Sequence, residues 1–193
     1  MVEQAQHSLR ESTAALQGCL ERVPDAVADA SRLILDALRR GRKAVLFGNG
    51  GSAADAQHLA ADLVGRFGRQ RAPVPAVALT ADTAVLTAVG NDYGFDRVFA
   101  RQVEALVGAG DVVIAISTSG RSANVVEGVR AARRTGARVV VLTGSEGGAL
   151  ARLADVVIRV PSTQTARIQE AHIAIGHAIC AIVEAAWVRR GTR

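Results

Sequence analysis

The sequence predicts an α/β fold: a three-layer αβα sandwich on a five-stranded parallel sheet. Five short apolar runs with β-branched content alternate with stretches of helical periodicity. Near-continuous apolar strands of this kind are typical of parallel sheets that are covered on both faces. The chain has 193 residues, of which 49% are hydrophobic and 21% charged, which suits one domain with a substantial core. We therefore expect residues 1–193 to form a single domain.

The first 40 residues predict two helices that precede the sheet. The expected helices span 2–20 and 24–40, with a break near Pro24, and Gly41 ends the second one. Apolar residues of the second helix recur at spacings of three and four, which gives one apolar stripe. The stripe needs a partner surface, on the sheet, on another subunit, or on both.

Residues 41–193 are expected to form the α/β core, without repeats, linkers or a second domain. The expected strands are 43–48, 74–80, 112–118, 138–143 and 156–160. The expected helices are 53–67, 94–107, 122–135, a short one near 148–153, and a long one from about 164 to 189.

Composition argues against several classes of protein. The net charge is +5, but the arginines are scattered and only 3% of residues are aromatic, so we expect a solvated basic surface and no nucleic-acid partner. No uninterrupted apolar run reaches the roughly 18 residues of a membrane span, and the first residues lack a secretory pattern. The two cysteines form no C-x-x-C pair, which fits buried thiols of a reducing compartment. We expect a cytoplasmic protein.

A glycine-rich turn follows the first strand and opens a helix. It contains Asn49, Gly50, Gly51 and Ser52. Glycines let a backbone approach a ligand, and a helix N-terminus offers free N–H groups to an anion or a hydroxyl. The alternative is a tight turn in which Ser52 caps the helix. The spacing does not match a dinucleotide-binding fingerprint.

A second loop, after the third strand, is rich in hydroxyl groups. Ser117, Thr118, Ser119 and Ser122 surround Gly120 and precede a helix. Hydroxyls and backbone amides of such a loop can donate to the oxygens of a phosphate. No Walker lysine follows, which argues against a nucleoside triphosphate. The alternative is a serine-rich turn with a capping residue.

Four side chains on two distant helices have the chemistry of metal ligands. His58 and Asp62 are four residues apart on one predicted helix and share a face. Gln169 and His177 lie about two turns apart on the last helix. An imidazole and a carboxylate at this spacing can hold one divalent metal, although a surface His–Asp pair is the commoner arrangement. His172 and Glu170 are interpreted as structural.

The segment from Gly90 to Gly94 is ambiguous. Asn, Asp and Gly favour a turn between helical stretches. Alternatively, Asn91 and Asp92 could hydrogen-bond the hydroxyls of a sugar.

Taken together, these segments resemble the sugar isomerase (SIS) domain family, and within it the phosphoheptose isomerases. The resemblance covers nearly the whole chain and rests on a set of motifs in this order: GNGGSAADAQH, GNDYGF, ISTSGRSAN, LTGSEGG and RIQEAHIAIGH.

The resemblance implies a zinc-dependent isomerase that converts D-sedoheptulose 7-phosphate to D-glycero-D-manno-heptose 7-phosphate through an enediol. It implies Asp62 as the catalytic base, His177 as the acid, and His58, Asp62, Gln169 and His177 as zinc ligands. The implied substrate contacts are Asn49, Gly50, Gly51, Ser52, Asp62, Asn91, Asp92, Ser117, Thr118, Ser119, Ser122 and Gln169. Members of the family are tetramers with bundled N-terminal helices and sites between subunits. Their heptose product serves bacterial envelope glycans such as lipopolysaccharide.

Two departures and one alternative accompany the resemblance. Asp62 stands where the isomerases have glutamate, and a shift of about 1 Å in a reacting group can cost on the order of 10²-fold in rate. Arg121 stands where asparagine is common and should add positive charge beside the phosphate. The alternative is a non-catalytic SIS-domain protein that binds the bacterial replication initiator; retention of an acid at 62 and of His177 favours the enzyme. The four implied zinc ligands argue against a different phosphosugar isomerase or a sugar-phosphate sensor, since many SIS domains lack them.

Overall fold

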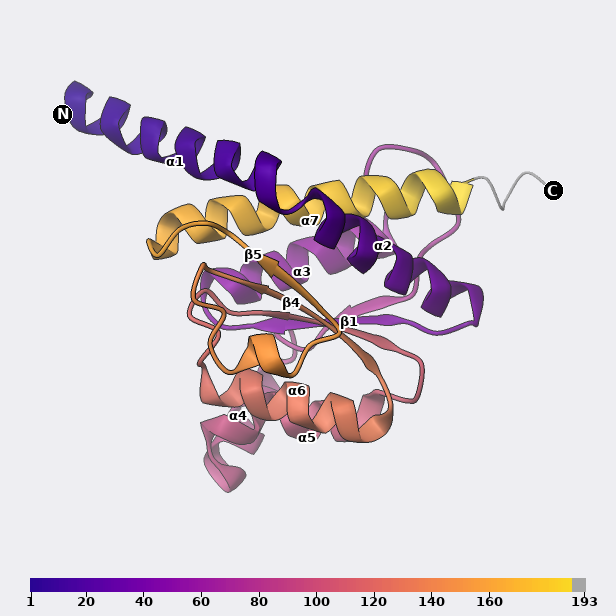
Figure 1. Ribbon diagram of the computed structural model, residues 1–193. Helices are drawn as coiled ribbons and strands as arrows, with labels where there is room; N and C mark the ends of the chain where they lie inside the picture. The colour runs from indigo at the N-terminus through magenta and orange to yellow at the C-terminus, as the bar shows by residue number, and fades with distance from the viewer. Residues whose placement is uncertain (189–193) are drawn as a thin grey trace.

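Five parallel strands form one sheet in the order β2-β1-β3-β4-β5 (Figure 1). The computed structural model describes residues 1–188. The strands are β1 (Ala44–Gly48), β2 (Ala76–Ala78), β3 (Val112–Ile116), β4 (Arg138–Thr143) and β5 (Val156–Arg159). In the register of β1 and β3, Ala44 faces Val112 and Gly48 faces Ile116, so the two strands end at the same level. The predicted five-stranded parallel sheet is confirmed.

Helices cover both faces of the sheet and complete the three predicted layers. Strand residues alternate between the two cores: Leu46 and Ile114 face one, Val45 and Val113 the other. Figure 1 shows α1, α2, α3 and α7 on one side of the sheet and α4, α5 and α6 on the other. Their bounds are α1 (Val2–Arg22), α2 (Pro24–Arg39), α3 (Gly51–Val64), α4 (Thr83–Tyr93), α5 (Val98–Leu106), α6 (Ala123–Thr135) and α7 (Thr165–Val188), with short 3₁₀ helices at Phe95–Arg97 and Leu150–Arg152.

The N-terminal helices behave differently from each other. The apolar stripe of α2, with Ile34 and Leu38, is buried against the sheet and α7. In α1 only Ala15 and Cys19 are buried, and the helix extends beyond the sheet as an arm (Figure 1). The apolar residues that α1 exposes are therefore available to another surface.

The expected strand 74–80 is too long at both ends. Pro75 has no N–H to donate to a ladder, and regular pairing covers only Ala76–Ala78. This edge strand is also partly exposed, whereas β1 and β3 are buried throughout.

Of the two alternatives for 90–94, the turn is not formed: these residues end a helix, α4, that the sequence analysis did not predict. α4 begins after Asp82, whose Oδ1 accepts the Val85 N–H at 3.0 Å, and it runs through Gly90 to Tyr93. Gly94 stops it with a φ of 90°. None of its residues is buried, so polar turn formers are tolerated in its last turn. The expected helix 94–107 is accordingly a 3₁₀ turn followed by α5.

The last helix has the length and apolar composition that a membrane span requires. Thr165–Val188 meets both criteria, and 44% of its most apolar window is buried. In the fold, α7 packs against α1, α2, α3 and β4, as a core helix does. The expected end at residue 189 lies outside the described residues. Both cysteines are free and buried, and burial raises the pKa of Cys19 and raises that of Cys180 to about 12, which disfavours the thiolate form that a nucleophile needs.

Candidate active site

The two predicted ligand-binding loops lie side by side at the carboxyl edge of the sheet. From β1 the chain continues to β2 on one side, while β3 lies on the other. Open α/β sheets bind ligands at such a switch point. Asn49, after β1, and Asn124, at the start of α6, exchange two side-chain amide hydrogen bonds of 2.8 Å each. This pair ties the two loops together.

The glycine-rich turn brings the end of β1 close to α7. Gly50 adopts a φ of 55° and precedes the first residue of α3, so Ser52 lies inside the helix, buried, and does not cap it. A Cβ on Gly51 would lie 2.6 Å from Nε2 of Gln169. Only glycine therefore allows the Gln169 amide to lie against the first turn of α3.

The hydroxyl-rich loop forms the rim of a small cavity. Gly120 has a φ of 64°, and a Cβ there would lie 2.1 Å from the Gly147 carbonyl oxygen, so two loops meet where only glycine fits. The hydroxyls of Ser117 and Ser122 lie 3.2 Å apart. Thr118 and Ser119 line the cavity together with residues 144–146, 162–163, 165 and 168. The free N–H groups at the start of α6 add the positive end of a helix dipole.

Arg121 does not add free positive charge beside this cavity. Its guanidinium lies 2.8 Å from a carboxylate oxygen of Glu146, which itself lines the cavity. Both side chains are more than half exposed, so water screens the pair. The cradle thus relies on hydroxyls and backbone amides more than on this arginine.

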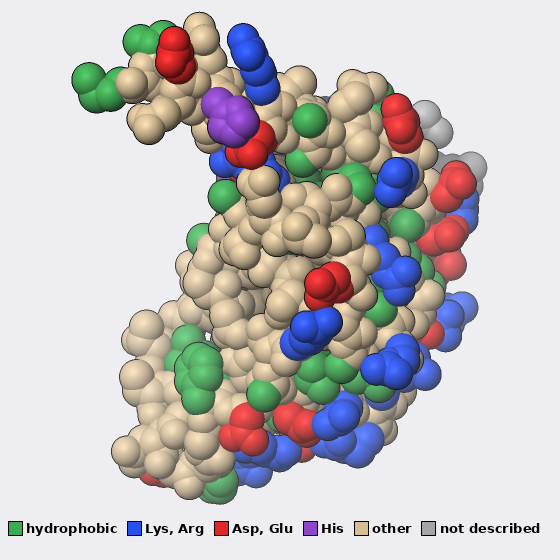
Figure 2. Space-filling model, turned by 60° about the vertical axis from the view of Figure 1, so that its left-hand side comes forward, with side chains coloured by type: hydrophobic (Ala, Val, Ile, Leu, Met, Phe, Trp, Pro, Cys, Tyr) green, Lys and Arg blue, Asp and Glu red, His purple; other side chains and the backbone are tan. Residues whose placement is uncertain are grey.

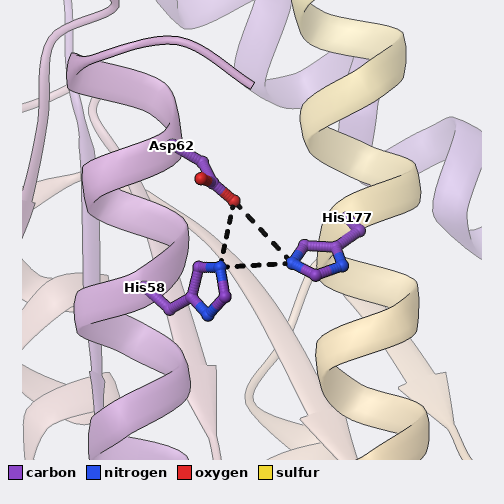
Figure 3. Close-up of side chains that lie close together, drawn as sticks. All are labelled: His58, Asp62 and His177. Carbon is purple, nitrogen blue, oxygen red and sulfur yellow. Dashed lines mark hydrogen bonds and ion pairs between the residues drawn. The ribbon is translucent and has the colours of Figure 1, made fainter. Parts of the chain in front are cut away.

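Three of the four predicted metal ligands converge between α3 and α7. Figure 3 shows His58 and Asp62 on α3 facing His177 on α7. Oδ2 of Asp62 lies 3.6 Å from Nε2 of His58 and 3.8 Å from Nε2 of His177. The two imidazole nitrogens lie 3.4 Å apart. Oδ2 of Asp62 is buried and accepts no hydrogen bond from the described part of the chain.

This arrangement fits a zinc ion. Zinc bonds to nitrogen and oxygen are about 2.0–2.2 Å long, which puts tetrahedral ligand atoms roughly 3.3–3.6 Å apart. The observed triangle is close to that size. A buried carboxylate oxygen without a hydrogen bond is costly, and a cation between the three groups would satisfy it. The surface-pair alternative does not account for His177.

Gln169 is on the same helix but is not joined to the triad. Its amide lies against Gly51, and within residues 1–188 no hydrogen bond connects it to His58, Asp62 or His177. Its place as a fourth ligand stays a prediction.

The sequence reading missed two residues next to the triad. Asp55 precedes His58 by one turn of α3, and its buried Oδ2 has no hydrogen-bond partner among the described residues. Burial raises the pKa of Asp55, and the imidazoles of His58 and His177 partly oppose this. The Phe67 ring lies 5.4 Å from the His177 ring, centre to centre. The i, i+3, i+7 spacing of Asp55, His58 and Asp62 on one helix was the available signal.

Other predicted residues lie elsewhere. Asn91 donates to Asp92 over 2.8 Å, and both are exposed at the end of α4; neither contacts the triad in the described chain. His172 is fully buried, and burial lowers its pKa to about 4, outweighing the Thr143 backbone, which raises it. Glu170 pairs with Arg167 at 2.9 Å. These positions are compatible with the structural roles expected of His172 and Glu170, which stay predictions.

Comparison with known proteins agrees with this geometry. The SIS domain family model matches residues 8–144. A phosphoheptose isomerase of Aquifex aeolicus is 50% identical over 184 residues, covering 95% of this chain and 96% of the relative. One from Rhodospirillum rubrum is 55% identical over 169 residues, covering 86% and 90%. The chain belongs to the phosphoheptose isomerases of the SIS domain family.

Solved structures of phosphoheptose isomerases have the same fold. One from Neisseria gonorrhoeae superposes with a TM-score of 0.90 at 46% identity, covering 95% of this chain and 98% of that one. One from Francisella tularensis gives 0.92 at 38% identity, with the same coverage. The chain is thus an enzyme, a sugar-phosphate isomerase, and this finding disfavours the alternative of a non-catalytic binding protein.

Proposed function

We propose that this isomerase converts D-sedoheptulose 7-phosphate to D-glycero-D-manno-heptose 7-phosphate, with Asp62 as the base, His177 as the acid and zinc as the cofactor. The observation that carries the proposal is the triad of His58, Asp62 and His177, two of whose members lie on the helix that the glycine-rich loop opens. The relatives are phosphoheptose isomerases, which supports a seven-carbon sugar phosphate as the substrate.

The reaction moves one proton between adjacent carbons. Asp62 takes the proton from C1 while His177 gives a proton to the carbonyl oxygen at C2, which forms an enediol. Loss of the proton on the C1 oxygen and return of a proton to C2 give the aldose. Asp62 suits the base because its side chain is 19% exposed and carries a second oxygen, Oδ1, besides the one that faces the two imidazoles. His177 suits the acid because its side chain is 38% exposed and can reach a substrate.

The hydroxyl-rich loop is proposed to hold the 7-phosphate. Ser117, Thr118, Ser119 and Ser122 offer hydroxyls at the start of α6, and hydrogen bonds to a charged oxygen are the stronger kind. Asn49, Gly50, Gly51 and Ser52 would contact the sugar, with Asn49 held by Asn124. Because the two loops follow neighbouring strands, phosphate and sugar can bind along one crevice.

Zinc would be held by His58, Asp62 and His177, with Gln169 as the proposed fourth ligand. When bound, it would polarise the carbonyl and hydroxyl oxygens of the sugar and stabilise the charge that develops on them. The chain's own groups then orient the substrate and move the protons.

The protein is proposed to act in the cytoplasm as a homo-oligomer, specifically a tetramer. α1 exposes Leu9 and Leu20 at 68% each, and Figure 2 shows hydrophobic side chains on the projecting arm. We propose that subunit contacts cover this arm. They would also bring Asn91 and Asp92, exposed at the end of α4, to a neighbouring crevice.

The test is an isomerase assay with sedoheptulose 7-phosphate, before and after chelation and zinc addition. Chelated enzyme should lose activity and regain it with zinc. Full activity in verified metal-free protein would remove zinc from the mechanism. No turnover of this sugar, by enzyme that turns over another sugar phosphate, would overturn the substrate.

A further inference from the structure

We propose that the buried ion pair of Glu184 and Arg71 is a positioning device: it sets the spacing of α3 and α7 at the triad and holds Phe67 against His177. The inference deepens the proposed function and rests on the triad being the metal site. Glu184 and Arg71 touch neither the proposed substrate loops nor the three ligand side chains.

Glu184 binds the loop that follows α3. Its Oε1 accepts the N–H groups of Gly68 at 2.8 Å and Arg69 at 2.7 Å. Its Oε2 accepts the Phe67 N–H at 2.9 Å and Nε of Arg71 at 3.2 Å. The side chains of Arg71 and Glu184 are 2% and 4% exposed. Burial alone would raise the pKa of Glu184, but the three backbone donors and Arg71 outweigh it and hold the pKa below its usual range.

Arg71 carries the connection back to the end of α3. Its Nη2 donates to the Asp62 carbonyl oxygen at 2.7 Å, and its Nη1 donates to those of Gly65 and Ala72 at 3.3 and 3.1 Å. The last carbonyls of a helix have no partner within the helix. Arg71 therefore caps α3 and fastens it, through Glu184, to α7.

The ion pair and the triad join the same two helices. The backbone carbonyl oxygen of Asp62 accepts a hydrogen bond from Arg71, while its side-chain carboxylate belongs to the triad. Glu184 follows His177 by seven residues, which is about two turns, so both point from one face of α7. A change in the helix spacing at Glu184 would thus widen the triangle of ligand atoms.

Phe67 is a second connection between Glu184 and the triad, because it contacts the His177 ring. Its N–H is held by Glu184, and its ring lies 5.4 Å from the His177 ring at an interplanar angle of 43°. The ring limits the rotation of an imidazole that would otherwise be free on its exposed side. Groups behind metal ligands commonly matter: their mutation costs about 10–100-fold in affinity or activity.

The chain contains a matched control that involves neither α3 nor α7. Asp111, 3% exposed, accepts the N–H groups of Lys43 and Gly108 at 3.1 and 2.9 Å and pairs with Nζ of Lys43 at 2.7 Å. This is the same chemistry, a buried carboxylate that holds backbone N–H groups and a cation. It lies just before β3, and its partners Lys43 and Gly108 belong to neither α3 nor α7, so losing it does not act on the contact between the two helices that hold the triad.

The experiment measures the zinc affinity of metal-free full-length protein by competition with a chelating dye, alongside urea unfolding. Glu184→Gln should weaken zinc binding about 10–100-fold, whereas Asp111→Asn should leave it within about twofold, although both lose stability. Arg71→Lys should fall between them, because lysine keeps the charge, but its single nitrogen cannot reach the Glu184 carboxylate and three separate carbonyls together. Phe67→Leu should lower kcat more than it changes KM.

The outcomes separate this inference from the proposed function. Equal zinc affinity in Glu184→Gln and Asp111→Asn would overturn the positioning role while the metal site stands. Absence of zinc binding by the parent protein would instead overturn the proposed function. If Glu184→Gln does not fold, Arg71→Lys and Phe67→Leu decide: parent-like affinity in the first and parent-like kcat in the second would refute the inference.

Discussion

Replacement of Gly51 by alanine should separate activity from stability in this enzyme. Gly51 is the first residue of α3, and the Gln169 amide lies directly against it. An alanine Cβ would lie 2.6 Å from Nε2, 2.8 Å from Cδ and 2.9 Å from Oε1 of Gln169. The substitution therefore places one methyl group where the structure has a side-chain amide.

The size of the effect follows from these distances. Ordinary contact for a Cβ begins at 3.4 Å, so the amide must move by about 0.8 Å from its position at 2.6 Å. A displacement of about 1 Å in an active site can cost on the order of 10²-fold in rate. We expect kcat/KM to fall by about 50–100-fold, because Gln169 is a proposed contact of both zinc and substrate. Stability should change little, because the Gln169 amide is the far end of a flexible side chain and can move away from the new methyl group.

The assay is steady-state turnover of sedoheptulose 7-phosphate together with urea unfolding of the same samples. Gly108→Ala is the control, because its Cβ would meet nothing nearer than 4.0 Å, and it should retain activity. Parent-like kcat/KM for Gly51→Ala would show that the Gln169 amide has no part in the reaction. Loss of stability in step with activity would show that the contact is structural.

Three further predictions concern other parts of the molecule. Asp62→Ala should abolish turnover with an unchanged far-UV circular dichroism spectrum, while Asp36→Ala, at an exposed ion pair on α2, should behave as the parent; substantial residual turnover would refute the assignment of the base. Ser119→Ala should raise KM by about 10–100-fold, since a hydrogen bond to a charged group contributes about 1.5–3 kcal/mol, and an unchanged KM would place the phosphate elsewhere. Burial lowers the pKa of His172 from 6.5 to about 4, so as the pH falls the unfolded chain binds a proton before the folded chain does. The contribution of His172 to the free energy of unfolding is therefore complete above pH 6.5 and is lost as the pH falls to 4. Urea unfolding should show a loss of about 2 kcal/mol between pH 7 and pH 5, and His172→Gln should remove it; equal slopes for the two proteins would contradict the linkage.

The sequence predicted the sheet well because a strand that is buried on both faces is a continuous run of apolar residues. Runs such as Val112–Ile116 are apolar on both faces, as a doubly covered parallel sheet requires. The same reading failed at α4, where Gly90, Asn91 and Asp92 favour a turn by local preference. An exposed helix with an Asp82 cap tolerates them, and the missing signal is the absence of any buried stripe.

The candidate site was predicted unevenly for a similar reason. The spacing of His58 and Asp62 places both on one face of α3, and the glycine-rich motif marks the turn before it. Asp55 was missed although it lies on the same face of α3. Acidic residues are common on helices, and nothing in the sequence shows that the His177 imidazole lies near this one. Phe67 was missed because its ring meets His177 only in the folded chain.

By itself, the amino-acid order determined the layers, the two loops and the residue types of the triad, because periodicity and loop chemistry act over a few neighbouring residues. Only the tertiary structure decided which groups meet. His58 and His177 are 119 residues apart, and Arg71 and Glu184 are 113 apart. Such contacts depend on how α3 and α7 pack over the sheet, and side-chain packing at this distance leaves no periodic trace in the sequence.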